Sequence, residues 1–172
     1  KPLGMGTMTT AAKLGKITWE ELEPAARQMA TLNAAAARAM GRVDAHACTD
    51  ITGFGLIGHA MNIARASELC FTIDAGRVPL FGDVFALAKR GLFSGGAKRG
   101  REALGADVDL AGDLDETTIG LLFDAETSGG LLIVVSPDDA SALEAALAEE
   151  GLPVHAIGRF GPSGEHHIRV RA

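Results

Sequence analysis

The sequence lacks the features that identify membrane proteins, nucleic-acid-binding proteins and cysteine-based metal sites. No uninterrupted apolar run approaches a membrane span, and Leu131–Val135 is typical of a buried strand instead. The net charge of −6 argues against nucleic acid as a main partner, because phosphate backbones require concentrated Lys and Arg. Only two cysteines are present, Cys48 and Cys70, far apart and without metal-site spacing. We interpret both as small residues of buried strands rather than redox centres.

The composition is that of one globular domain. Of the 172 residues, 47% are apolar and 22% are charged, which is enough to build a real core. There is no signal-peptide pattern, so the cytosol is the expected compartment and no membrane is expected as a partner. The chain opens at Lys1-Pro2-Leu3-Gly4 without an initiating methionine, and no helix or strand is predicted there. We interpret this as a cut inside a larger protein; a processed or engineered terminus is the alternative.

Helices and strands alternate along the predicted chain. Thr18 and Glu21 fit a capping box, Pro24 predicts a break or a second start, and a helix is expected from Ala25 to Met40. Phe93–Arg101 is predicted to be an exposed loop. The other expected elements are strands Ala45–Thr49, Leu69–Asp74 and Leu131–Val135, helices Leu56–Ala66, Val84–Arg90, Glu116–Leu122 and Ser136–Glu150, and a hairpin of Val154–Phe160 with His166–Val170. This pattern predicts an α+β fold, a sandwich of helices packed on a mixed β-sheet.

The segment Thr49–His59 is the most informative part of the chain. It combines the carboxylate of Asp50, the hydroxyls of Thr49 and Thr52, and three glycines that include Gly53 and Gly55. Glycine lets backbone N–H groups approach an anion, and an aspartate beside such a turn can hold the Mg²⁺ that accompanies a polyphosphate. The alternative is a strand-to-helix turn in which Asp50 or Thr52 caps the helix.

Two further loops have open roles. Asp124–Gly130 carries two carboxylates, two hydroxyls and two glycines, and is interpreted as a tight turn rather than a polar pocket. Gly95–Arg99 offers two cations on flexible backbone, which suits either an anion or a solvated surface. The five histidines show no zinc-site spacing, and no Gly-x-Ser-x-Gly element is present, so nucleophilic catalysis by this chain is not expected.

Taken together, these segments resemble the C-terminal half of the selenophosphate synthetase (selenide, water dikinase) family. The resemblance covers nearly the whole chain in the right order. It rests on Lys1–Gly4 with Thr9-Thr10, His46–His59, Ile73-Asp74, Val78-Pro79, Gly95-Gly96 with Arg99, Leu121–Asp124, Thr127–Leu132 and Ile157-Gly158. Two departures leave loop contacts open: Ala125-Glu126 replaces the family's usual Pro-Gln, and Gly100 follows Arg99 where the family tends to have Asn.

The resemblance implies the fold of the aminoimidazole-ribonucleotide-synthetase-like superfamily. It implies a transferase that makes selenophosphate, AMP and phosphate from ATP, selenide and water, with ATP and Mg²⁺ bound between an N-terminal and a C-terminal domain. Residues 1–172 would be that C-terminal domain, and the family's catalytic cysteine or selenocysteine, its essential lysine and most metal-binding aspartates belong to the N-terminal half. The resemblance also implies a homodimer formed mainly through the N-terminal domain.

Within this half, the resemblance assigns Asp50 to metal and phosphate binding. Thr49, Thr52, Gly53 and Gly55 are the expected cofactor-binding residues around it. No catalytic residue is expected in this half, and the isolated chain is predicted to fold without dikinase activity. Two alternatives stay open: a sister ATP-dependent enzyme of the aminoimidazole ribonucleotide synthetase or thiamine-phosphate kinase type, and a non-catalytic module that binds nucleotide or a partner protein.

Overall fold

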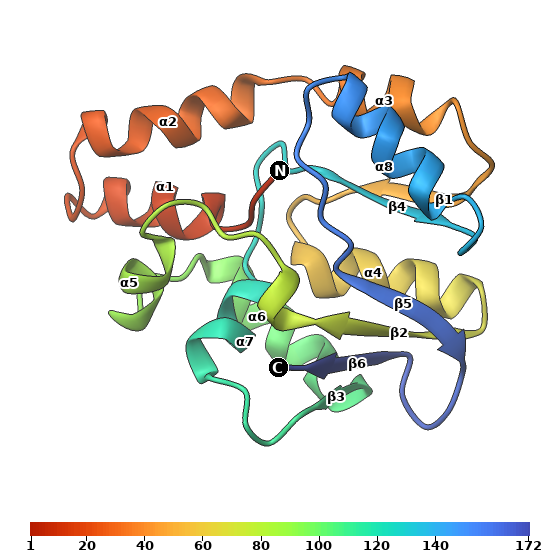
Figure 1. Ribbon diagram of the computed structural model, residues 1–172. Coiled ribbons are helices and arrows are strands. Elements are labelled where there is room, and N and C mark those ends of the chain that lie inside the picture. Colours follow the sequence, from red (N-terminus) through yellow and green to blue (C-terminus); the bar gives the residue numbers. More distant parts are fainter.

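A computed structural model describes all 172 residues, Lys1 to Ala172 (Figure 1). The helices are α1 (Met5–Lys13), α2 (Trp19–Ala30), α3 (Ala34–Met40), α4 (Gly55–Ala66), α5 (Val84–Lys89), α6 (Gly95–Leu104), α7 (Glu116–Leu122) and α8 (Ala140–Glu149). The strands are β1 (Ala45–Asp50), β2 (Leu69–Asp74), β3 (Val108–Leu110), β4 (Leu131–Val135), β5 (Gly158–Pro162) and β6 (Ile168–Arg171). The predicted α+β class with helices packed on a mixed sheet is confirmed.

The strands form two sheets on either side of α4. β1 and β4 pair antiparallel, with Asp50 opposite Leu131, while the other sheet has the order β3-β6-β2-β5. β2 pairs antiparallel with β5 and parallel with β6, so this second sheet is mixed. In Figure 1, α4 lies between the two sheets, with β1 and β4 on one side and β2 on the other. The end of β1 and the start of α4 are therefore held against the centre of the fold.

The predicted C-terminal hairpin is wrong. β5 and β6 do not pair with each other, because β2 lies between them and hydrogen-bonds to both. A Gly-Pro-containing turn between two apolar runs is typical of a hairpin, but the register of distant strands depends on which faces the helices cover. Here the central strand comes from the middle of the chain.

Three helix predictions also need correction. Pro24 lies inside α2 rather than at a break, and the interruption falls at residues 31–33, so the expected helix from Ala25 to Met40 is two helices. The segment predicted as an exposed loop contains α6, whose first turn is capped by the Ser94 hydroxyl. Directly after the opening segment, α1 begins at Met5, where no helix was predicted.

The core has two parts. The larger cluster surrounds the buried face of α4 and joins both sheets through side chains such as Ile57 of α4, Ile73 of β2 and Leu132 of β4. The smaller cluster lies among α1, α2, α5 and α7 and includes Met5, Val84 and Leu121. This second group forms the lobe seen beside the sheets in Figure 1. The loop that joins α7 to β4 runs past both clusters.

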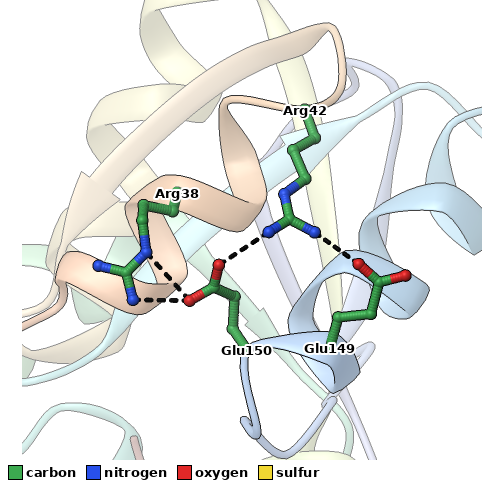
Figure 2. Close-up of polar contacts among 4 residues, drawn as sticks. All are labelled: Arg38, Arg42, Glu149 and Glu150. Atoms are coloured by element: carbon green, nitrogen blue, oxygen red, sulfur yellow. Dashed lines mark hydrogen bonds and ion pairs between the residues drawn. The ribbon is translucent and has the colours of Figure 1, made fainter.

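Helices α3 and α8 lie side by side above β1 and β4. Figure 2 shows the ion pairs that connect the C-terminal ends of the two helices: Arg38 donates to Glu150 at 2.6 Å, and Arg42 donates to both Glu149 at 2.6 Å and Glu150 at 2.9 Å. Glu150 thus accepts from both arginines, and the pKa of its carboxyl is lowered by the hydrogen bond from Arg38.

Candidate functional site

Asp50 lies at the end of β1 with its side chain exposed. Its carboxylate makes no hydrogen bond or ion pair with the rest of the chain. β1 alternates, so Ala45, Ala47 and Thr49 are half-buried while His46, Cys48 and Asp50 are exposed. The alternation follows from an antiparallel pair with only one covered face. The Asp50 carboxylate is therefore available to a ligand that approaches the open face.

The interpretation of both cysteines as buried residues is half correct. Cys70 in β2 is buried, whereas Cys48 in β1 is exposed beside Asp50. Ala45–Thr49 was predicted to be a buried strand, but β1 belongs to a two-stranded sheet with one open face. No cluster of three or more His, Cys, Asp or Glu side chains is present that could hold a metal ion. A metal ion bound by Asp50 would therefore need further ligands from outside this chain, and metal binding by Asp50 remains a prediction.

The backbone on the C-terminal side of Asp50 is pinned to the loop before β4. The N–H of Ile51 donates to the carbonyl of Gly130 at 2.9 Å, and the N–H of Gly129 donates to the carbonyl of Ile51 at 3.1 Å. The N–H of Glu126 donates to the carbonyl of Thr52 at 2.9 Å. A Cβ on Gly129 would meet the Ile51 carbonyl at 2.3 Å, so this close approach requires glycine there. The turn that carries Asp50 is fixed rather than loose.

His59 adds a side-chain anchor that the sequence analysis did not assign. Its Nε2 accepts from the backbone N–H of Thr52 at 3.1 Å and lies 3.0 Å from the Thr52 hydroxyl, while its Nδ1 lies 3.5 Å from the Thr49 hydroxyl. The imidazole is only 9% exposed, and burial lowers its pKa while Asp50 acts to raise it. The signal in the sequence was its position one helical turn after Gly55, because side chains tilt back toward the start of a helix.

The four predicted cofactor-binding residues have different surroundings. Thr49 and Thr52 both turn their hydroxyls toward His59. Gly53 is exposed, with open space where a Cβ would be. Gly55 starts α4 at a φ of +68°, and a Cβ there would meet the Asp124 carbonyl at 2.7 Å, so its role is close packing. Of the four, Gly53 alone presents unobstructed backbone, and binding by the set remains a prediction.

The two carboxylates of the second loop are buried and structural. Asp124 accepts from the Thr7 hydroxyl at 2.6 Å and from the N–H groups of Ser94 and Ala125, both at 3.1 Å. Glu126 accepts from the N–H groups of Gly4 at 2.7 Å and Met5 at 3.0 Å. Desolvation raises the pKa of Glu126 to about 7, although the two hydrogen bonds act to lower it. The tight-turn interpretation describes this loop better than a polar pocket, because its carboxylates hold α1 and the start of α6.

A groove opens beside the Asp50 turn, between α4 and α6. It has a volume of about 450 Å³ and shares Gly53 with that turn; its other lining residues include Phe54, Asn62, Gly96 and Arg99. Phe54 is 69% exposed at its rim. Lys98 and Arg101 pair with Glu102 and Glu116, whereas Arg99 makes no ion pair. An anion-binding role for Arg99 remains a prediction, now placed on a helix rather than a loop.

None of the helices has the length and apolar character needed to cross a membrane. The profile of the family described as "AIR synthase related protein, C-terminal domain" matches residues 1–171.

Relatives by sequence include the selenide, water dikinase of Pelobacter propionicus, 41% identical over 91% of this chain and 45% of the relative, and that of Porphyromonas gingivalis W83, 42% identical over 99% of this chain and 49% of the relative. The chain therefore spans about half the length of the curated relatives it matches. By fold, it resembles the thiamine-monophosphate kinase of Stenotrophomonas maltophilia K279a with a TM-score of 0.55, at 18% identity over 98% of this chain and 47% of the kinase. With a family match along practically its whole length, the chain belongs to the AIR synthase related proteins, as a C-terminal domain of that family.

Proposed function

We propose that this chain is the C-terminal domain of a selenide, water dikinase, which forms selenophosphate, AMP and phosphate from ATP, selenide and water. Support comes from the relatives of that name, which are about 40% identical along nearly all of this chain. The observation in the structure that carries the proposal is the exposed and unpaired carboxylate of Asp50. The backbone next to it is held by hydrogen bonds between Ile51 and residues 129–130.

Asp50 would contribute one oxygen ligand to a Mg²⁺–ATP site, and the remaining ligands would come from an N-terminal domain. Mg²⁺, when bound, neutralises the charge of the polyphosphate. The chain's own part is to hold the carboxylate in place. At Gly53, which has no side chain, it also leaves the backbone accessible to a ligand. The isolated chain would then be inactive, and the whole protein would be a cytoplasmic homodimer with ATP and selenide as substrates.

The test is ³¹P NMR of the full-length gene product with Mg²⁺, ATP and anaerobic selenide. We expect selenophosphate and AMP from the wild type and neither from Asp50→Asn, with the fold unchanged because the side chain is exposed. Asp138→Asn is the matched control, since Asp138 is also exposed and has no hydrogen-bond partner for its side chain. Near wild-type turnover by the Asp50 variant would refute the assignment of Asp50.

A sister kinase is the second candidate, favoured by the TM-score of 0.55 to thiamine-monophosphate kinase over 98% of this chain. At 18% identity that likeness supports the fold alone, so the dikinase is preferred. ADP without AMP in the same spectra, together with phosphorylation of a small acceptor, would favour the sister kinase. A folded full-length protein without any turnover would favour a binding module.

A further inference from the structure

We propose that His59 is a positioning residue for Asp50, acting through the residues on both sides of it. The inference rests on the proposed function, since its value depends on Asp50 binding Mg²⁺–ATP. Thr49 precedes Asp50 in β1 and Thr52 follows it in the turn, and one imidazole from α4 reaches both. No other side chain outside residues 49–52 hydrogen-bonds to this segment.

The bond from Thr52 determines the tautomer of His59. A backbone N–H only donates, so Nε2 at 3.1 Å must present a lone pair to it. Nε2 therefore carries no proton, and the ring proton of the neutral imidazole is on Nδ1. From there it points to the Thr49 hydroxyl at 3.5 Å, a long contact that the oxygen accepts. In this tautomer a single ring connects the strand end to the turn across Asp50.

The ring is held on the helix side as well. The Phe54 ring lies 5.7 Å from it, centroid to centroid and tilted by 52°, and the imidazole is nearly buried. The loop side of the turn is already fixed by the backbone bonds between Ile51 and residues 129–130. His59 supplies the opposing attachment, so the backbone bearing the Asp50 carboxylate is held from two directions. A metal ligand whose supporting contacts are removed commonly loses about 10- to 100-fold in metal affinity or activity.

The first test uses the full-length protein and two substitutions of similar size. His59→Leu fills the space without an acceptor, whereas His59→Gln can place its amide oxygen near the Nε2 position and accept from Thr52. We expect the Leu variant to need about 10-fold more Mg²⁺ for half-maximal turnover with ATP, and the Gln variant to stay within about threefold of wild type. His59→Asn, whose amide reaches only the Nδ1 position, should behave as the Leu variant does.

The second test reads the contact itself and does not depend on turnover. Long-range ¹H–¹⁵N spectra of the imidazole should show His59 protonated at Nδ1, and the Thr52 amide proton should shift upfield in the Leu variant and return in the Gln variant. A ring protonated at Nε2 would overturn the proposal. If the Leu variant fails to fold, comparison of the Gln and Asn variants decides the same question.

The outcomes separate this inference from the proposed function. If Asp50→Asn is inactive while His59→Leu and His59→Asn match wild type in Mg²⁺ dependence, His59 does not position Asp50, and the dikinase assignment stands. If the wild type makes no selenophosphate, the proposed function fails. In that case Mn²⁺ titration of the same variants still decides the role of His59, because bound Mn²⁺ broadens the amide signals around Asp50. Equal broadening in the wild type, the Leu variant and the Gln variant would refute the positioning role of His59.

Discussion

The carboxylate of Glu126 accepts a hydrogen bond from the backbone N–H of Gly4 at 2.7 Å, directly before the first turn of α1. Burial raises the pKa of this group from 4.5 to about 7, so the folded state holds the proton more tightly than the unfolded state does. The contribution of Glu126 to stability is therefore fully present below about pH 4.5 and is lost as the pH rises through about 7.

We expect the free energy of unfolding of the wild type to fall between pH 5 and pH 8 relative to that of Glu126→Gln, by up to about 3 kcal/mol. The amide does not titrate, so the variant removes this part of the pH dependence. Urea denaturation at several pH values measures it, with Glu165→Gln as the exposed control. Parallel pH profiles for wild type and Glu126→Gln would contradict the buried, raised-pKa carboxyl.

Asp124 lies in the same loop and serves three donors, from Thr7, Ser94 and Ala125. Asp124→Ala removes the acceptor of the buried Thr7 hydroxyl and of the half-buried Ser94 N–H, while the Ala125 N–H keeps the Ser94 hydroxyl at 3.3 Å, and the change should lower the free energy of unfolding by about 3 kcal/mol. Asp124→Asn should cost about 1 kcal/mol, because its oxygen keeps the two backbone bonds and its amide can donate to the Thr7 hydroxyl. Equal losses in the two variants, measured by urea unfolding, would show that these bonds are not what Asp124 contributes.

Gly55 and Gly15 form a matched pair of glycines with φ of +68° and +63°. Alanine at Gly15 has open space around its Cβ and should cost only the backbone strain, about 1 kcal/mol. Alanine at Gly55 would also meet the Phe123 and Asp124 backbone at 2.7–2.8 Å and should cost about 3 kcal/mol or more. The difference in midpoint urea concentration between the two variants measures the cost of the steric overlap at Gly55, because the backbone strain is common to both. Similar midpoints would mean that α4 does not lie so close to that loop.

The pairs between α3 and α8 should contribute little. Glu150→Gln is expected to lower Tm by about 2 °C at low salt and by nothing measurable at 1 M salt, because both arginine partners are exposed and salt screens their charge. The pKa of Glu150 is lowered by Arg38, so its contribution is present at neutral pH and disappears as the pH falls below the ordinary range of a glutamate. Glu144→Gln on the exposed face of α8 is the control. A large decrease in Tm that persists at 1 M salt would show that these ion pairs are not screened by solvent.

The elements that sequence reasoning located are those with a local signal. The capping box at Thr18 and Glu21 is confirmed by both of its hydrogen bonds, 2.7 Å and 3.3 Å. The strand predictions at Leu69–Asp74 and Leu131–Val135 match β2 and β4. Even α6 had such a signal in Ser94, which was outweighed by the two glycines that follow it. Local chemistry was sufficient wherever caps and apolar runs determine the structure.

What could not be predicted depends on contacts between distant residues. The exposure of Cys48 and Asp50 depends on β1 having one covered and one open face; the alternation of Ala45 and Ala47 with His46 and Asp50 was a local signal for this, but it is short and the helix that covers one face comes from elsewhere in the chain. His59 lies in an apolar helix sequence, and its bonds to the Asp50 turn exist only once α4 folds back along β1. The pairing of β5 with β2 rather than with β6 has the same origin.

The position of β2 at the centre of its sheet also bears on how the protein is synthesised. The strands that pair with its two edges begin at Gly158 and Ile168, and both are synthesised long after β2 itself. Until then the nascent chain carries an apolar strand with two open edges, the state most exposed to self-association and to chaperones. Such distant pairings slow folding, and a chain that stops before Gly158 would leave β2 with neither of its neighbours.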